Sequence, residues 1–131
     1  MAYDAFLLAS SQLRERGKAR LVIDGENLFI ESAQIKNRWL LYTRVYFGEG
    51  YLPNSIRSCV SSSGVLRWQQ TGAYLKLDPL TYSVFLFQEV EMEEGKYIPF
   101  RHHLSDFTKV AAEWREILHD FEQAELSQID L

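Results

Sequence analysis

The sequence predicts an α+β domain in which two terminal helices pack against a twisted antiparallel sheet. Three observations support this prediction. Residues 100–121 have the apolar periodicity of one long helix, residues 38–47 have the composition of a strand, and two short polar turns each join a pair of strand-like runs. The expected order of elements is α-β-β-β-α-β-β-α. We expect a single domain over residues 1–131, in which residues 122–131 form a frayed polar tail.

The start of the chain predicts a helix followed by two short strands. Residues 2–16 place their apolar side chains broadly on one side of a helix, and Gly17 stands where a C-terminal cap is expected. Residues 20–24 and 28–33 have the pattern of strands, and the polar turn 25–27 joins them. We therefore expect a tight hairpin.

The third expected strand, residues 38–47 (RWLLYTRVYF), is dense in aromatic and β-branched residues. Both of its faces are apolar. One face carries Trp39, Leu41, Val45 and Phe47, and the other carries Leu40, Tyr42 and Tyr46. We expect this strand either to be covered on both faces, or to be covered on one face and left to meet a partner on the other.

The second half of the chain predicts a short helix and another hairpin. Pro53 begins the short helix, which extends through Ser63. The hairpin has strands at 65–77 and 81–92, and Gly72 indicates a bulge or a close backbone approach in the first of them. Because the connecting turn is short, we expect these two strands to pair antiparallel.

The long helix over residues 100–121 carries one continuous apolar stripe. At 100° per residue its members fall within an arc of about 100°. They are Phe100, Leu104, Phe107, Ala111, Trp114, Leu118 and Phe121. Val110 and Ile117 widen the stripe along one edge, so we expect the helix to cover a broad apolar surface. The pattern does not decide which face of the sheet it covers.

Composition and charge exclude several classes of protein. The chain has 131 residues, is 47% apolar and carries a net charge of −4, so we expect a globular protein that does not bind nucleic acid directly. The single cysteine, Cys59, rules out an internal disulfide, and no apolar run approaches the roughly 18 residues of a membrane span. Because residues 1–8 lack the basic start of a signal peptide, we expect a cytoplasmic protein without membrane insertion.

Residues able to carry chemistry are few and poorly grouped. Cys59 has no evident base beside it in the sequence, and such a cysteine is usually a packed hydrophobe. His102 and His103 are adjacent, so on a helix they point about 100° apart and cannot hold one metal ion together, and His119 lies elsewhere. We therefore expect no catalytic residue, no metal and no cofactor. The excess of apolar and aromatic residues on the strands favours a binding protein.

Four stretches of the chain match the pattern of a known family. They are residues 21–30 (LVIDGENLFI), the pair Leu52-Pro53, residues 73–87 (AYLKLDPLTYSVFLF) and residues 107–118 (FTKVAAEWREIL). With the order of elements, the small size and the acidic charge, they resemble the class I chaperones of bacterial type III secretion systems over essentially the whole chain. The chain departs from the family in its short N-terminal helix and in the low apolar content of residues 53–63.

The resemblance implies a protein of the bacterial cytoplasm that binds the N-terminal segment of a secreted effector, keeps it partly unfolded and presents it to the secretion ATPase. It also implies a homodimer, or a pair with a related subunit. The residues implied for client binding are Phe6, Leu7, Leu28, Ile30, Trp39 and Leu41. Those implied for the dimer interface are Ile56, Val60, Leu66, Trp68 and Tyr74. On this reading, Trp39→Glu abolishes client capture with little loss of fold.

Two other functions remain open at this point. Some members of the family act as regulators that sequester a transcription component, such as RNA polymerase or a transcription factor, and the sequence pattern does not separate these from effector chaperones. The second alternative is an enzyme or a small-ligand carrier. It requires a pocket with converging polar groups, and the sequence offers no motif that would build one.

Overall fold

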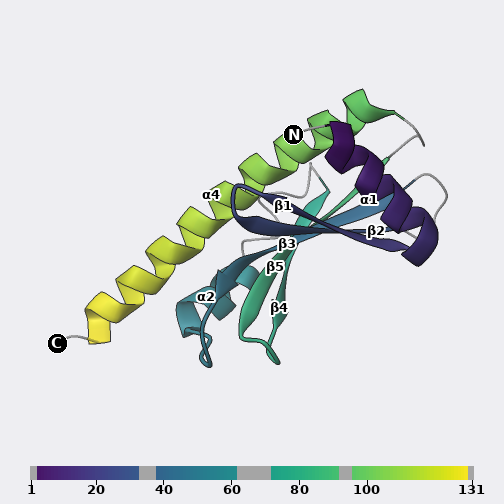
Figure 1. The fold of residues 1–131 in the computed structure, drawn as a ribbon. Coiled ribbons are helices and arrows are strands. Elements are labelled where there is room, and N and C mark those ends of the chain that lie inside the picture. The colour runs from purple at the N-terminus through teal and green to yellow at the C-terminus, as the bar shows by residue number, and fades with distance from the viewer. Residues whose placement is uncertain (1–2, 33–37, 62–71, 92–95, 130–131) are drawn as a thin grey trace.

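The computed structural model describes residues 3–32, 38–61, 72–91 and 96–129. Its elements follow the expected order, so the predicted fold class is confirmed (Figure 1). The helices are α1 (Tyr3–Arg16), α2 (Asn54–Cys59) and α4 (Tyr97–Ile129), and the strands are β1 (Lys18–Ile23), β2 (Glu26–Ser32), β3 (Arg38–Phe47), β4 (Ala73–Asp78) and β5 (Ser83–Glu91).

The described strands form one antiparallel sheet in the order β1-β2-β3-β5-β4. β3 is the central strand and pairs with β2 on one side and with β5 on the other. β5 returns beside β3, and β4 pairs with the outer side of β5, so the antiparallel pairing of the predicted second hairpin is confirmed. Residues 65–71 of its predicted first strand lie outside the described residues.

A two-residue turn joins β1 to β2. Ile23 pairs with Glu26, and the two residues between them, Asp24 and Gly25, have φ angles of +51° and +79°. Positive φ at both central positions gives a turn whose twist matches that of the flanking strands, and the Asp-Gly pair is among the sequences best able to adopt it. The sequence placed this turn one residue later, at 25–27, but the pairing shows that Glu26 and Asn27 belong to β2.

Both long helices lie on one face of the sheet, which we call the covered face. α4 packs along β3 and β5, and α1 packs on β1 and β2. The two helices meet where the rings of Phe6 and Phe100 lie 4.9 Å apart. α2 packs on the C-terminal half of α4, where the amide of Ser55 donates a hydrogen bond of 3.0 Å to Glu125. The structure therefore has a sheet layer and a helix layer (Figure 1).

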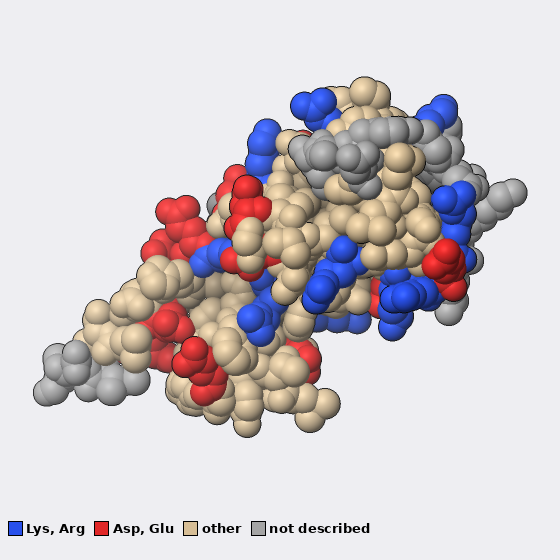
Figure 2. All heavy atoms as spheres, in the orientation of Figure 1, with Lys and Arg blue, Asp and Glu red and all other residues tan. Residues whose placement is uncertain are grey.

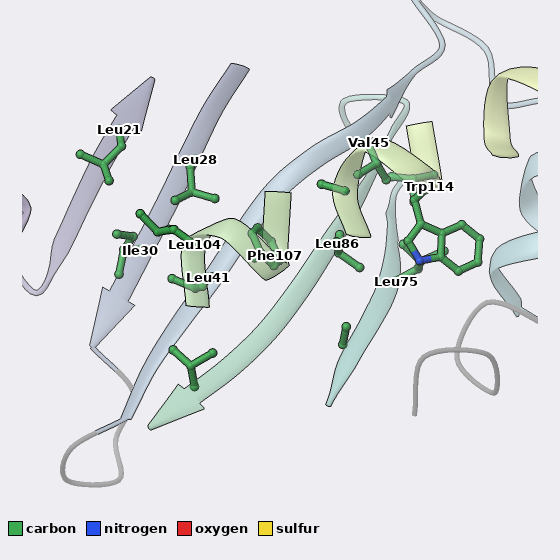
Figure 3. Close-up of a cluster of buried hydrophobic side chains, with 14 of the residues drawn as sticks. Leu21, Leu28, Ile30, Leu41, Val45, Leu75, Leu86, Leu104, Phe107 and Trp114 are labelled. Atoms are coloured by element: carbon green, nitrogen blue, oxygen red, sulfur yellow. The ribbon is translucent and has the colours of Figure 1, made fainter. Parts of the chain in front are cut away.

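The hydrophobic core fills the space between the covered face and α4. Figure 3 shows Leu28, Leu41 and Leu86 of the sheet lying toward Phe107 and Trp114 of the helix. Six of the seven predicted stripe residues are buried, and the exception is Phe121, which is 42% exposed. The helix also continues to Ile129, where the sequence predicted a frayed tail from residue 122. Its C-terminal turns extend past the sheet, which explains the exposure of Phe121 (Figure 1).

A bulge in β3 changes the alternation near the end of the strand. Arg44 pairs with Phe85, but the next pair joins Tyr46 to Val84, which leaves Val45 as an extra residue. Val45 is buried, and the Tyr46 hydroxyl bonds to Glu122 of α4, so both side chains face the helices. The sequence placed Tyr46 on the opposite face from Val45, and the bulge is the reason this was wrong.

Candidate functional site

The face of the sheet opposite the described helices, the open face, carries a line of four aromatic rings. They come from four neighbouring strands and occupy directly paired positions. Phe29 of β2 pairs with Tyr42 of β3, Tyr42 pairs with Phe87 of β5, and Phe87 pairs with Tyr74 of β4. We call these four residues the aromatic row. All four side chains are partly exposed.

The rings of the aromatic row are stacked. Neighbouring ring centroids along the row are 5.2, 5.2 and 5.5 Å apart, and the ring planes lie within 18°, 21° and 10° of one another. Phe85 adds a fifth ring beside Tyr42 and Phe87, at 6.4 and 6.3 Å. Offset stacks of this kind stabilise a pair by about 0.5–1.5 kcal/mol beyond the area they bury, so the row is a fixed surface.

Strand alternation explains why the rings gather on this face. The covered face of β2, β3 and β5 is mainly aliphatic, with Leu28, Ile30, Leu41, Val84 and Leu86 against the helices, and its aromatic residues, Trp39 and Tyr46, lie near the two ends of β3. The residues between them point the other way, because successive side chains of a strand alternate between faces. The open face is therefore aromatic where the covered face is aliphatic.

The phenol groups of the row stay neutral over the physiological pH range. Burial, together with the 2.8 Å hydrogen bond that the Tyr42 hydroxyl donates to Glu31, raises the pKa of Tyr42 to about 12. Burial, and then the nearby charge of Glu89, also raises the pKa of Tyr74. The aromatic row thus presents uncharged rings whose polar ends lie toward carboxylates.

A shallow hollow of about 340 Å³ lies beside the row. Its lining residues are Tyr42, Lys76, Leu77, Asp78, Phe85 and Phe87. Asp78 is held by its own turn, since its carboxylate accepts hydrogen bonds from the amide of Leu80 (3.1 Å) and the hydroxyl of Thr81 (2.8 Å). Lys76 is the cation at the hollow, with its ammonium 5.7 and 5.9 Å from the ring centres of Phe87 and Tyr74. The hollow can accept one apolar side chain.

A second hollow, of about 180 Å³, lies between the β1–β2 turn and α4. Arg115 of α4 lies at it and bonds to the sheet. Its guanidinium donates to the hydroxyl of Thr43 (3.1 Å) and twice to the carbonyl of Arg44 (3.0 and 3.3 Å), and it lies 3.7 Å from Glu26. Because the guanidinium of Arg115 is bound by these partners, its role is structural: it holds α4 against β3 beside the bulge.

The structure places four of the six residues expected to bind a client in the hydrophobic core. Phe6, Leu28, Ile30 and Leu41 are each at most 3% exposed, because α1 and α4 cover them. Trp39 is partly buried on the same face, with its ring edge-on to Phe100 at 5.7 Å. Leu7 is 47% exposed on α1. The four sheet residues of this set, Leu28, Ile30, Trp39 and Leu41, do share one face, but the described helices cover it.

The residues expected at the dimer interface are divided between two places. Ile56 and Val60 of the α2 region are buried in the core of the protomer. Tyr74 belongs to the aromatic row, on the edge strand β4. Leu66 and Trp68 lie outside the described residues.

The candidates for chemistry remain scattered in the structure. Cys59 is buried. Within the residues that the structure describes, no group of three or more histidine, cysteine, aspartate or glutamate side chains is placed to hold a metal ion. No described helix is long and apolar enough to cross a membrane. Sequence reasoning missed the aromatic row as a unit, although the contrast between aliphatic and aromatic residues on alternate strand positions was a signal for it.

Comparison with known proteins was informative at the level of structure. No protein-family model matches the chain, and no curated protein matches its sequence. Among solved structures, a chain of the ExsC-ExsE complex is similar over 88% of this chain and 92% of its own length, with 22% identity and a TM-score of 0.65. A chain of the HopA1-SchA chaperone-effector complex is similar over 85% and 92%, with 16% identity and a TM-score of 0.60.

Both similarities cover nearly the whole of each chain, at an identity too low to indicate more than a shared fold. The fold of the chain is therefore shared, over nearly its whole length, with one chain of each of these two solved complexes. This similarity in fold to a chain of a chaperone-effector complex is consistent with the resemblance that the sequence indicated.

Proposed function

We propose that this protein is a type III secretion chaperone that binds an N-terminal segment of a secreted effector, keeps it partly unfolded and helps to target it to the secretion apparatus. The fold supports this proposal, since similar chains occur in a chaperone-effector complex. The observation that carries it is the aromatic row, a line of stacked and partly exposed rings that the described helices leave open.

The shape of the open face suits a client without tertiary structure. Its rings form a surface across four strands, and the hollow beside them is shallow. A folded partner would need a complementary surface, whereas an unfolded segment can place several apolar side chains along the row one after another. Ordering the segment costs free energy, so the resulting affinity is modest for the area covered and the client can be released.

We propose that the client contacts the open face rather than the covered face. Binding to Leu28, Ile30 or Leu41 would require α4 to leave the core, which would expose an apolar stripe five turns long. Covering the aromatic row requires no such rearrangement. Leu7, which is exposed on α1, remains a candidate for additional client contacts.

We further propose that the protein acts as a dimer, with itself or with a related subunit. Among the described strands β4 lies at one edge of the sheet, and unpaired edges are sites of strand addition. Because Ile56 and Val60 are buried in the core, the dimer contact would use the outer, exposed side of α2. The secretion ATPase is proposed as the partner that receives the loaded complex.

Affinity capture of the tagged chain from its native cytoplasm tests the proposed function, with mass spectrometry of the captured proteins and light scattering of the purified chain. We expect a secreted protein bound through its N-terminal segment and a particle of about twice 15.3 kDa. Capture of RNA polymerase or of a transcription factor would favour the regulatory alternative. A monomer that captures no protein would contradict the proposal.

A matched pair of variants tests the site. Phe87 is at the centre of the aromatic row, and Phe121 is an exposed phenylalanine on α4. We expect Phe87→Ala to weaken capture of the client strongly and Phe121→Ala to leave it unchanged. Equal capture by both variants, with both still folded by circular dichroism, would place the client elsewhere.

A further inference from the structure

The charges on the open face are distributed unequally about the aromatic row. On one side of the row, where β1 and β3 begin and β2 and β5 end, the charges neutralise one another. Lys18 lies 3.7 Å from Glu31, and Arg38 lies 3.4 Å from Glu89 and 3.3 Å from Glu91. Each of these two cations, Lys18 and Arg38, therefore has a carboxylate partner.

On the other side of the row, and at its β1 end, the cations have no such partners. Arg44 of β3 and Lys76 of β4 pair on either side of Phe85, so the three side chains form a second line parallel to the aromatic row. Arg20, paired with Phe29, extends the aromatic row at the β1 end. None of these three cations forms an ion pair with a residue that the structure describes.

Two of these cations, Arg44 and Lys76, lie over aromatic rings. The guanidinium of Arg44 is 4.4 Å from the ring centre of Phe47, and Lys76 is within 6 Å of two rings of the aromatic row. A cation over a ring keeps most of its hydration and remains able to bind a carboxylate. Lys76 also lines the shallow hollow. An apolar side chain placed in the hollow would therefore have a cation beside it.

The rest of the surface makes this arrangement specific. The chain is acidic overall, with a net charge of −4, and acidic side chains gather over the C-terminal half of α4 (Figure 2). An acidic partner is repelled by that part of α4. Because salt screens charges beyond about 8 Å at physiological ionic strength, however, the cations at the aromatic row act locally on a segment bound there.

We propose that the open face binds an acidic amphipathic segment of a partner protein, whose apolar side chains lie on the aromatic row and whose carboxylates face Arg44 and Lys76. The inference rests on the proposed function in so far as the partner is a protein segment, and it adds the charge of that segment. A segment of the same apolar residues with basic neighbours binds less tightly, because its cations would face Arg44 and Lys76.

Two synthetic peptides test the proposal by fluorescence anisotropy. One is a fluorescein-labelled peptide of phenylalanine, leucine, serine and glutamate, and the other has lysine at each glutamate position. We expect the acidic peptide to bind the full chain more tightly. The double variant Arg44→Glu/Lys76→Glu should lose about tenfold in affinity for the acidic peptide and gain affinity for the basic one.

Lys109→Glu is the matched control, because it reverses an exposed charge on α4 away from the sheet. It should leave both affinities unchanged. Circular dichroism checks that each variant is folded, and Arg44→Gln/Lys76→Gln provides a milder second variant that should lose affinity for the acidic peptide without gaining affinity for the basic one.

Three results would overturn the inference. The first is equal binding of both peptides to the unaltered chain, and the second is an equal effect of the Lys109→Glu control. The third is dissociation of a dimer by the double variant in light scattering, which would identify a second copy of the chain as the occupant of the face. If capture from cytoplasm finds no secreted protein but the peptides behave as expected, the proposed function fails and this inference stands. If capture finds a secreted protein but the two peptides bind equally, the proposed function stands and the charge preference fails.

Discussion

Two adjacent residues of β3 give the sharpest test of which face the helices cover. Trp39 lies against α4 with its ring edge-on to Phe100, whereas Leu40 points to the open face between Glu31 and Glu89. Trp39→Gln and Leu40→Gln introduce the same amide one residue apart. We expect their effects on the free energy of unfolding to differ clearly.

The expected magnitudes follow from burial. Removing a fully buried tryptophan or phenylalanine side chain costs about 3–5 kcal/mol, and because Trp39 is partly buried we expect about 3 kcal/mol. Leu40 is partly exposed, and water can fill the space it leaves, so we expect about 1 kcal/mol. Trp39→Glu adds the cost of desolvating a carboxylate. In contrast to the expectation from sequence, we therefore expect that variant to destabilise the fold.

Urea unfolding followed by far-UV circular dichroism measures both variants without relying on tryptophan fluorescence. At an m value of about 2 kcal/mol/M, a difference of about 2 kcal/mol separates the two midpoints by about 1 M. Equal midpoints would refute the assignment of the covered face. A lower midpoint for Leu40→Gln than for Trp39→Gln would mean that the aromatic face is the packed one.

Three further predictions concern the stability of the fold, each tested by a substitution at a defined position. Arg115→Met removes both hydrogen bonds to the carbonyl at the β3 bulge and should lower the free energy of unfolding in urea by about 1–2 kcal/mol. Gly48→Ala would make its methyl group collide with the backbone carbonyl oxygen of Tyr51 and should cost more than about 2 kcal/mol, whereas Gly17→Ala, strained only by its φ of +73°, should cost about 1 kcal/mol. Because the folded-state pKa of Tyr42 is raised to about 12, its contribution to stability is complete below about pH 10 and is lost as the pH rises toward about 12, so the advantage of the unaltered chain over Tyr42→Phe in urea unfolding should shrink over that interval.

Periodicity was sufficient for the elements whose apolar residues repeat regularly over many positions. The stripe of α4 is buried from Phe100 to Leu118, because a period near 3.6 maintained over five turns has no other consistent interpretation. The bounds predicted for β3, 38–47, match the structure. The second hairpin was also predicted correctly, since a short polar turn between two strand-like runs leaves antiparallel pairing as the simple solution.

The covered face could not be predicted from the same pattern. Alternation divides a strand into two faces, but in β3 both are apolar, so the pattern does not say which one the helices take. The expected client residues Leu28, Ile30 and Leu41 were grouped correctly on one face and then found in the core. What separates the two faces of the sheet is the kind of apolar residue, because the strands contribute mainly aliphatic side chains to the core, whereas stacked rings such as Tyr42 and Phe87 lie on the open face.

The extra residue in β3 reverses the alternation of inward-facing and outward-facing side chains along the strand. Before it, odd-numbered residues such as Leu41 face the helices; after it, Tyr46 takes that direction and Phe47 turns away. A related chain that lacks the extra residue would reach the end of the strand one position earlier with the same two faces. Any alignment of such a chain to this one therefore needs a one-residue gap at Val45, and an ungapped alignment would exchange inward and outward positions over the rest of β3.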